Sequence, residues 1–102
     1  MSSRHPTLVE ALSQRLLVVQ EISSAQSRNL LNRQLRGGAE FEVQRIEQEI
    51  AATGCSHALV KALEDARERL QTANAEMAAY DAHCAALELH LEELDGWIAA
   101  SR

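Results

Sequence analysis

Residues 59–98 read LVKALEDARERLQTANAEMAAYDAHCAALELHLEELDGWI, and this stretch decides the fold. Apolar or small side chains recur in it at alternating intervals of four and three residues: Leu59, Leu63, Ala66, Leu70, Ala73, Met77, Tyr80, Cys84, Leu87, Leu91, Leu94 and Ile98. This spacing predicts a long helix with one continuous apolar side. Such a helix exposes its leucines to water unless another helix covers them, so the stretch also predicts helix-on-helix packing.

The composition of the chain agrees with an all-α protein. A length of 102 residues suits one domain, and the only aromatic residues are Phe41, Tyr80 and Trp97. Large aromatic side chains normally fill thick cores, whereas a chain rich in Leu and Ala favours thin packing between helices. The net charge of −5 argues against direct binding to nucleic acid.

Helix boundaries follow from capping residues and glycines. Thr7 precedes an apolar periodic run and predicts a first helix over about 7–36, followed by the pair Gly37-Gly38. The pattern predicts a second helical stretch over about 39–52, a turn over 53–56 and the long helix over about 57–100. Together these elements form a single helical domain over 1–102.

Folding the chain back at Gly54 gives a long antiparallel helical hairpin that resembles a coiled coil. Residues that face each other then have numbers that sum to about 109 or 110. The apolar pairs expected from this register are Ile50–Leu59, Ile46–Leu63, Val43–Ala66, Ala39–Leu70, Val19–Leu91, Leu16–Leu94 and Leu12–Ile98. Opposite charges are also expected to meet, namely Glu40–Arg69, Glu42–Arg67, Glu49–Lys61, Arg33–Glu76, Arg28–Asp81 and Arg15 with Glu93 and Asp95.

The apolar stripe of the first arm changes phase near Gly37-Gly38. Heptads counted back from Ala39 reach polar residues, and the leucines resume one position away, at Leu35 and Leu31. Two glycines inside a helix cost about 1 kcal/mol each relative to alanine. We therefore expect the first arm to be kinked at this pair, with a true break into separate helices as the alternative.

A second apolar stripe lies nearly opposite the first on the long helix. It consists of Ala75, Ala78, Ala82, Ala85 and Leu89. Alanine is the best helix former and tolerates exposure, which is one interpretation. The other is that these small side chains form a partner-binding face, either for a second copy in a homodimer or higher helical bundle, or for another helical protein.

The sequence contains no motif that indicates catalysis. His83 and His90 are seven residues apart, so about 10 Å of helix separates them and one metal ion cannot bridge them. Cys84 falls on the apolar side, and Cys55 lies in the turn, where a reactive thiol is an alternative to an ordinary loop cysteine. We expect no catalytic residue, cofactor, metal or small-molecule site, and hence no enzyme.

Two cysteines, no apolar leader and no apolar run of membrane-spanning length predict a soluble cytoplasmic protein without membrane contact. The general shape is similar to small bacterial helical hairpins that serve secretion machines as chaperones or stalk proteins. We therefore expect a protein–protein interaction module, such as an adaptor, small chaperone or assembly component. One alternative is an acidic regulator that occludes a basic site on another protein, for instance one that binds nucleic acid. The other is a purely structural homo-oligomer.

Overall fold

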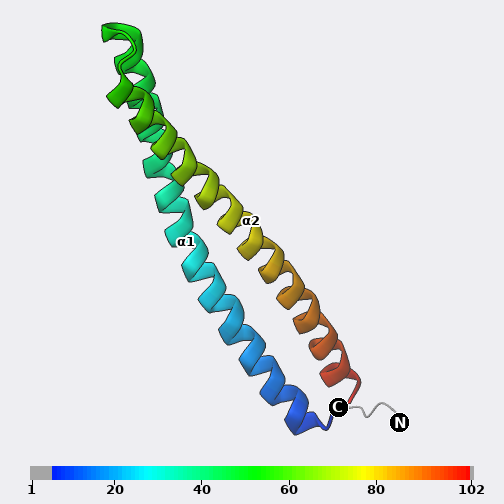
Figure 1. Cartoon of the computed structure of the whole chain (residues 1–102). Coiled ribbons are helices and arrows are strands. Elements are labelled where there is room, and N and C mark those ends of the chain that lie inside the picture. Colours follow the sequence, from blue (N-terminus) through cyan, green and yellow to red (C-terminus); the bar gives the residue numbers. More distant parts are fainter. Residues whose placement is uncertain (1–5, 102) are drawn as a thin grey trace, which may run out of the picture.

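The computed structural model describes residues 6–101, which form two long helices packed against each other in an antiparallel hairpin (Figure 1). Helix α1 spans Leu8–Thr53 and helix α2 spans His57–Ala100. The molecule is a rod with extents of 70 × 26 × 15 Å. The end of α1 that carries Leu8 and the end of α2 that carries Ala100 lie together, opposite the turn (Figure 1). The predicted all-α helical hairpin is confirmed.

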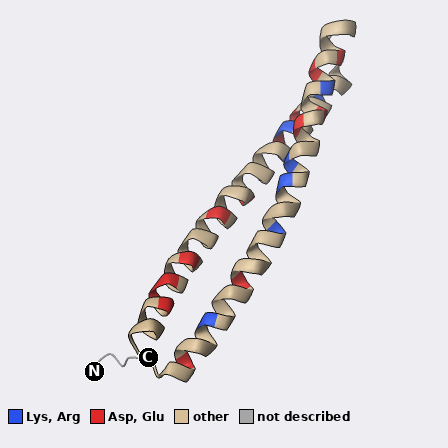
Figure 2. Ribbon diagram, turned by 180° about the vertical axis from the view of Figure 1, so that it is seen from behind, with Lys and Arg blue, Asp and Glu red and all other residues tan. Residues whose placement is uncertain are grey.

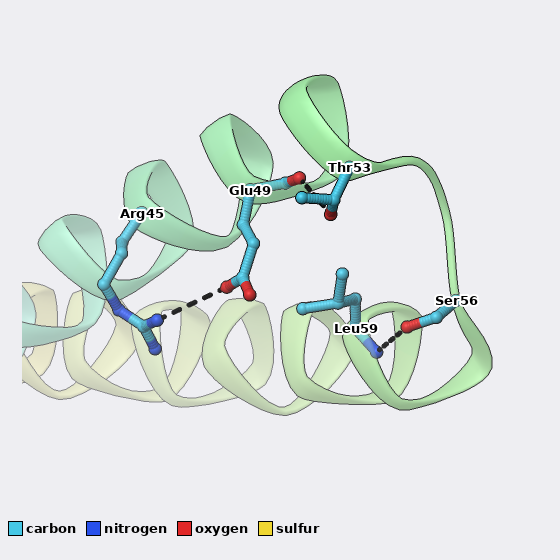
Figure 3. Close-up of polar contacts among 5 residues, drawn as sticks. All are labelled: Arg45, Glu49, Thr53, Ser56 and Leu59. Carbon is cyan, nitrogen blue, oxygen red and sulfur yellow. Dashed lines mark hydrogen bonds and ion pairs between the residues drawn. The ribbon is translucent and has the colours of Figure 1, made fainter.

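The turn between the helices forms where the sequence predicts it (Figure 3). Gly54 has a φ of 91°, and its backbone N–H donates a 2.8 Å hydrogen bond to the carbonyl of Ile50, which ends α1. The hydroxyl of Ser56 then accepts a 3.1 Å hydrogen bond from the backbone N–H of Leu59 and begins α2. The turn is therefore only three residues long, and it fixes which sides of the two helices meet.

The start of α1 is also set by a capping residue. The hydroxyl of Thr7 accepts a 3.1 Å hydrogen bond from the backbone N–H of Glu10, so Thr7 is the N-cap that the sequence predicts. Glu10 additionally places a negative charge in the first turn of α1, where the helix dipole favours it.

The core is a single row of side chains along the hairpin. In α1 one residue in every seven is buried, without a change of phase, along the series Ala11, Val18, Ala25, Asn32, Ala39 and Ile46. The buried residues of α2 follow the seam predicted from its sequence and are Ala66, Ala73, Met77, Leu87, Leu94 and Ile98. Half of this row is alanine or asparagine, so the two helices approach each other over a thin core.

The glycine pair neither breaks α1 nor shifts its seam, which corrects the sequence-based expectation. Helix α1 is continuous through Gly37-Gly38 instead of dividing into stretches over about 7–36 and 39–52. The tight turn fixes the phase at Ile46 and Ala39, and an uninterrupted helix carries that phase back along the arm. Polar Asn32 and Asn29 consequently enter the seam, and the neighbouring leucines leave it.

The apolar residues expected to pair near the turn are buried or half-buried, whereas those of α1 expected to pair far from it are exposed. Ile50, Ile46, Val43 and Ala39, with their predicted counterparts in α2, are all buried or half-buried, as the register requires. The pairs expected for Leu12, Leu16 and Val19 are wrong, because these three side chains are 38% to 59% exposed. Ala11 and Val18, each one residue earlier, pack in the core cluster with Leu87, Leu94 and Ile98.

Charged contacts between the helices confirm the register at a sum near 110. Arg15 Nε lies 2.6 Å from Asp95 Oδ1, as the sequence predicts. Arg69 pairs with Glu42, and Arg67 lies 4.0 Å from Glu47. These two acids lie two and five residues from the expected Glu40 and Glu42, because long arginine side chains reach along the helix as well as across it.

Candidate functional site

The predicted partner-binding face on α2 is open to solvent. Ala75, Ala78, Ala82, Ala85 and Leu89 are all exposed. All five lie on α2, and the opposite side of α2 packs against α1. The alanines leave a smooth surface that another helix can approach closely. Whether it binds a partner stays a prediction.

Helix α1 carries a larger apolar surface, which we call the α1 stripe and define as Val9, Leu12, Leu16, Val19 and Leu30. Their exposed fractions range from 38% to 73%. Each of them follows a seam position of the heptad by one residue, so the stripe is rotated by about 100° from the packed side of α1. The sequence predicts Leu12, Leu16 and Val19 in the hairpin core, and their exposure contradicts that prediction.

Other large apolar side chains of α1 are exposed outside this stripe. Leu17, Leu31 and Leu35 are each more than half exposed, and so is Phe41. Isolated exposed leucines are common on soluble proteins, whereas ten exposed large apolar side chains on α1 exceed what a single helix of a monomer usually shows. The hairpin leaves most of the large apolar residues in the first half of α1 without a partner inside the chain.

A polar layer interrupts the seam between the helices. Asn29 and Asn32 are buried, and Asn29 Nδ2 donates a 2.7 Å hydrogen bond to Asp81 Oδ1 on α2. Among the described residues, Asn29 Oδ1, Asn32 Nδ2 and Arg36 Nε are buried without a hydrogen-bond partner, although Arg36 Nε lies 3.8 Å from Glu40 Oε1. Buried polar groups of this kind cost stability and specify alignment in coiled coils.

Acidic residues gather on the second half of α2 (Figure 2). Between Leu70 and Ser101, α2 carries six acidic residues and neither Lys nor Arg. Asp81 and Asp95 contact α1, whereas Glu76, Glu88, Glu92 and Glu93 form no ion pair among the described residues. On α1, Arg28 donates a 3.5 Å hydrogen bond to the Tyr80 hydroxyl, and this contact raises the pKa of Arg28.

The shallow hollows on the described surface include two between the helices. One of about 720 Å³ lies between residues 34–42 of α1 and 65–76 of α2, and its walls include Gly38, Ala39 and Ala73. The other, of about 420 Å³, lies at the open end between Leu12 and Ile98. Both are open to solvent and lined mainly by apolar surface, which suits an apolar side chain of a docking protein better than a reaction.

The candidate chemical residues do not converge. His83 and His90 are exposed, Cys55 is exposed and Cys84 is half-buried. Within residues 6–101, no three His, Cys, Asp or Glu side chains gather into a group that could hold a metal ion. Neither helix of that region has the length and apolarity needed to cross a membrane.

These features define an antiparallel α-helical hairpin with two unpartnered helix faces. Comparisons with protein-family models, with curated proteins and with solved structures find no match for this chain. The function is therefore inferred from the exposed helix faces of the chain.

Proposed function

We propose that the chain is a non-catalytic protein–protein interaction module that acts through helix–helix packing, as an adaptor, small chaperone or assembly component does. The observation that carries this proposal is the α1 stripe, together with the leucines around it. An isolated hairpin exposes these side chains to water, at a cost of about 25 cal/mol for each Å² of apolar surface left uncovered. Packing against another helix removes that cost.

The shape of the molecule supports the same function. A rod only two helices thick has little room for a concave pocket that excludes water, which an active site usually requires. It offers long, flat helix faces instead, and helix-on-helix recognition uses side chains at the three- and four-residue spacing found in both open faces. A soluble protein of the cytoplasm remains our expectation for its location.

Capture of partners by the tagged chain from its own cells, followed by mass spectrometry, tests the proposal. Leu16→Glu places a charge in the α1 stripe, and Ala82→Glu with Ala85→Glu does so on α2. Leu17→Glu is the matched control, because Leu17 adjoins Leu16, is equally exposed and lies outside both faces. We expect one of the two face variants to lose captured proteins that the control retains. The proposal fails if all variants and the wild type capture the same proteins.

A second candidate is an acidic regulator that occludes a basic site on another protein. The uninterrupted acidic half of α2, with four glutamates that have no basic partner within the described chain, favours it (Figure 2). The two functions differ in their response to salt. An apolar interface retains its partner in 1 M NaCl, where the screening length is about 3 Å, whereas an acidic decoy releases it.

A further inference from the structure

We propose that the α1 stripe is covered by the same stripe of a second copy, so that two hairpins form an antiparallel four-helix dimer through α1. This inference rests on the proposed function and names its first partner. It is carried by the excess surface of the chain, by the central pairs that an antiparallel second copy forms along the stripe, and by charges that have no partner within one hairpin.

The surface of the chain is the first step. A compact monomer of 11.3 kDa exposes about 5,700 Å². The hairpin exposes 7473 Å². The difference is about 1,700 Å², and each subunit of an obligate dimer commonly buries about 1,000–2,500 Å². One further helix-to-helix interface for each chain therefore accounts for the excess.

The order of residues along the stripe is the second step. The positions between Val19 and Leu30 that continue its spacing are Ser23 and Gln26, which are both polar and exposed. An antiparallel copy whose paired residue numbers sum to 49 places Val19 against Leu30 of the second copy and Ser23 against Gln26 of the second copy. At these central positions apolar residues meet apolar ones and polar residues meet polar ones, twice by symmetry. Farther out, Leu16 and Val9 lie against Arg33 and Glu40 of the second copy.

The same register places Gly37 in the interface between the two copies. Leu12 falls against Gly37 of the second copy. Gly37 is exposed on the line of the stripe, and no atom lies within 4 Å of the position that a Cβ would occupy there. The bare backbone therefore leaves room for a leucine side chain, in the manner of small residues that let helices approach closely.

Charge complementarity is the third step. In this register Arg33 of the second copy lies level with Leu16. Leu16 in turn lies level with Leu94 on α2 of its own hairpin, because facing residue numbers in the hairpin sum to about 110. Glu92 is less than one turn away and faces the same side as the stripe. Neither Arg33 nor Glu92 has an ionic partner among the described residues. Within one hairpin they are separated by about 15 residues of helix, roughly 22 Å, so they can meet only between copies.

Sedimentation equilibrium of the full chain tests the dimer. We expect the wild type to be a dimer at concentrations near 100 μM, as an interface of this size implies. Val19→Glu should raise the dissociation constant at least about tenfold, because it buries a charge against Leu30 of the second copy. Leu17→Glu should leave it within about twofold. Circular dichroism of both variants checks that the hairpin is intact.

Charge reversal tests the register. Arg33→Glu and Glu92→Arg should each weaken the dimer about two- to fivefold, and the double variant should recover wild-type affinity. Glu93→Arg in place of Glu92→Arg is the matched control, since Glu93 adjoins Glu92 but points away from the stripe, and it should not rescue Arg33→Glu.

Three results overturn the proposal. They are a monomeric wild type at 100 μM, equal effects of Val19→Glu and Leu17→Glu, and rescue by Glu93→Arg as effective as rescue by Glu92→Arg. A monomer that still captures another protein through Leu16 disproves the second copy as the occupant and leaves the interaction module standing. A dimer that captures no other protein supports the second copy and favours the structural homo-oligomer over the adaptor.

Discussion

Asn29 and Asp81 are joined by a 2.7 Å hydrogen bond across the hairpin, although 52 residues separate them in the chain. Asn29 occupies a seam position at which the rest of the heptad pattern calls for an apolar residue, and only 5% of its surface is exposed. The bond therefore marks the alignment of the two arms. The side-chain oxygen of the same asparagine, Asn29 Oδ1, is buried without a hydrogen-bond partner among the described residues.

Replacing Asn29 by leucine should stabilise the hairpin and loosen its alignment. Leucine removes the buried unpaired oxygen and adds apolar contact, and Asp81 is exposed enough to return to water. We expect Asn29→Leu to raise the free energy of unfolding by about 1–2 kcal/mol, measured by urea denaturation. A loss of stability would show that the hydrogen bond to Asp81 outweighs the burial of an apolar side chain.

Gly38→Ala should stabilise α1 because the glycine lies inside a continuous helix. A Cβ at Gly38 would meet no atom within 4 Å, and alanine is better than glycine in a helix by about 1 kcal/mol. Gly54→Ala is the control and should destabilise the chain by at least that amount, since Gly54 has a φ of 91°. Thermal unfolding followed by circular dichroism measures both. Destabilisation by Gly38→Ala would indicate a break at the glycine pair.

Ile46→Ala should produce the largest loss among single truncations near the turn. Ile46 is 1% exposed and is the largest fully buried side chain in the described part of the chain. Removing its methyl and methylene groups should cost about 2–5 kcal/mol in the free energy of unfolding. Phe41→Ala removes a bigger side chain that is 69% exposed, and it should change stability by less than about 0.5 kcal/mol. Equal losses for the two variants would contradict the seam described above.

The Arg15–Asp95 ion pair should contribute little to stability. Both side chains are nearly half exposed, and the Arg15 Nε to Asp95 Oδ1 distance is 2.6 Å. A double-mutant cycle with Arg15→Ala and Asp95→Ala should give a coupling energy of about 0.2–1 kcal/mol, which falls in 1 M NaCl. A coupling that is unchanged by salt would mean that the pair is shielded from solvent.

The sequence predicts those features of the fold that depend on nearby residues, and the helix ends are the clearest example. Thr7, Gly54 and Ser56 determine helix ends through hydrogen bonds to residues three or four positions away, so their roles were readable in the sequence. The phase of α1 far from the turn was not readable in the same way. There the leucines and the alignment set by the turn favour different sides of one helix, and a local pattern cannot weigh one against the other.

The candidate surfaces show the same division. The exposed stripe from Ala75 to Leu89 was predicted correctly as a second apolar side of α2, because the seam of that helix is regular enough to define its opposite face. In the α1 stripe, Leu12, Leu16 and Val19 were instead assigned to the core. Their exposure became visible only when Ala11 and Val18 were found in the core cluster.

By itself the sequence determined that this chain is two long helices joined by a short turn at Gly54, since heptad spacing and capping depend on neighbours within one or two turns of helix. Only the tertiary structure decided which side of α1 faces α2. A continuous helix has one phase, the turn fixes it at Ala39 and Ile46, and the packing of these residues prevails over the leucines farther along. That choice places Asn29 in the seam beside Asp81 and leaves Leu16 open for a partner.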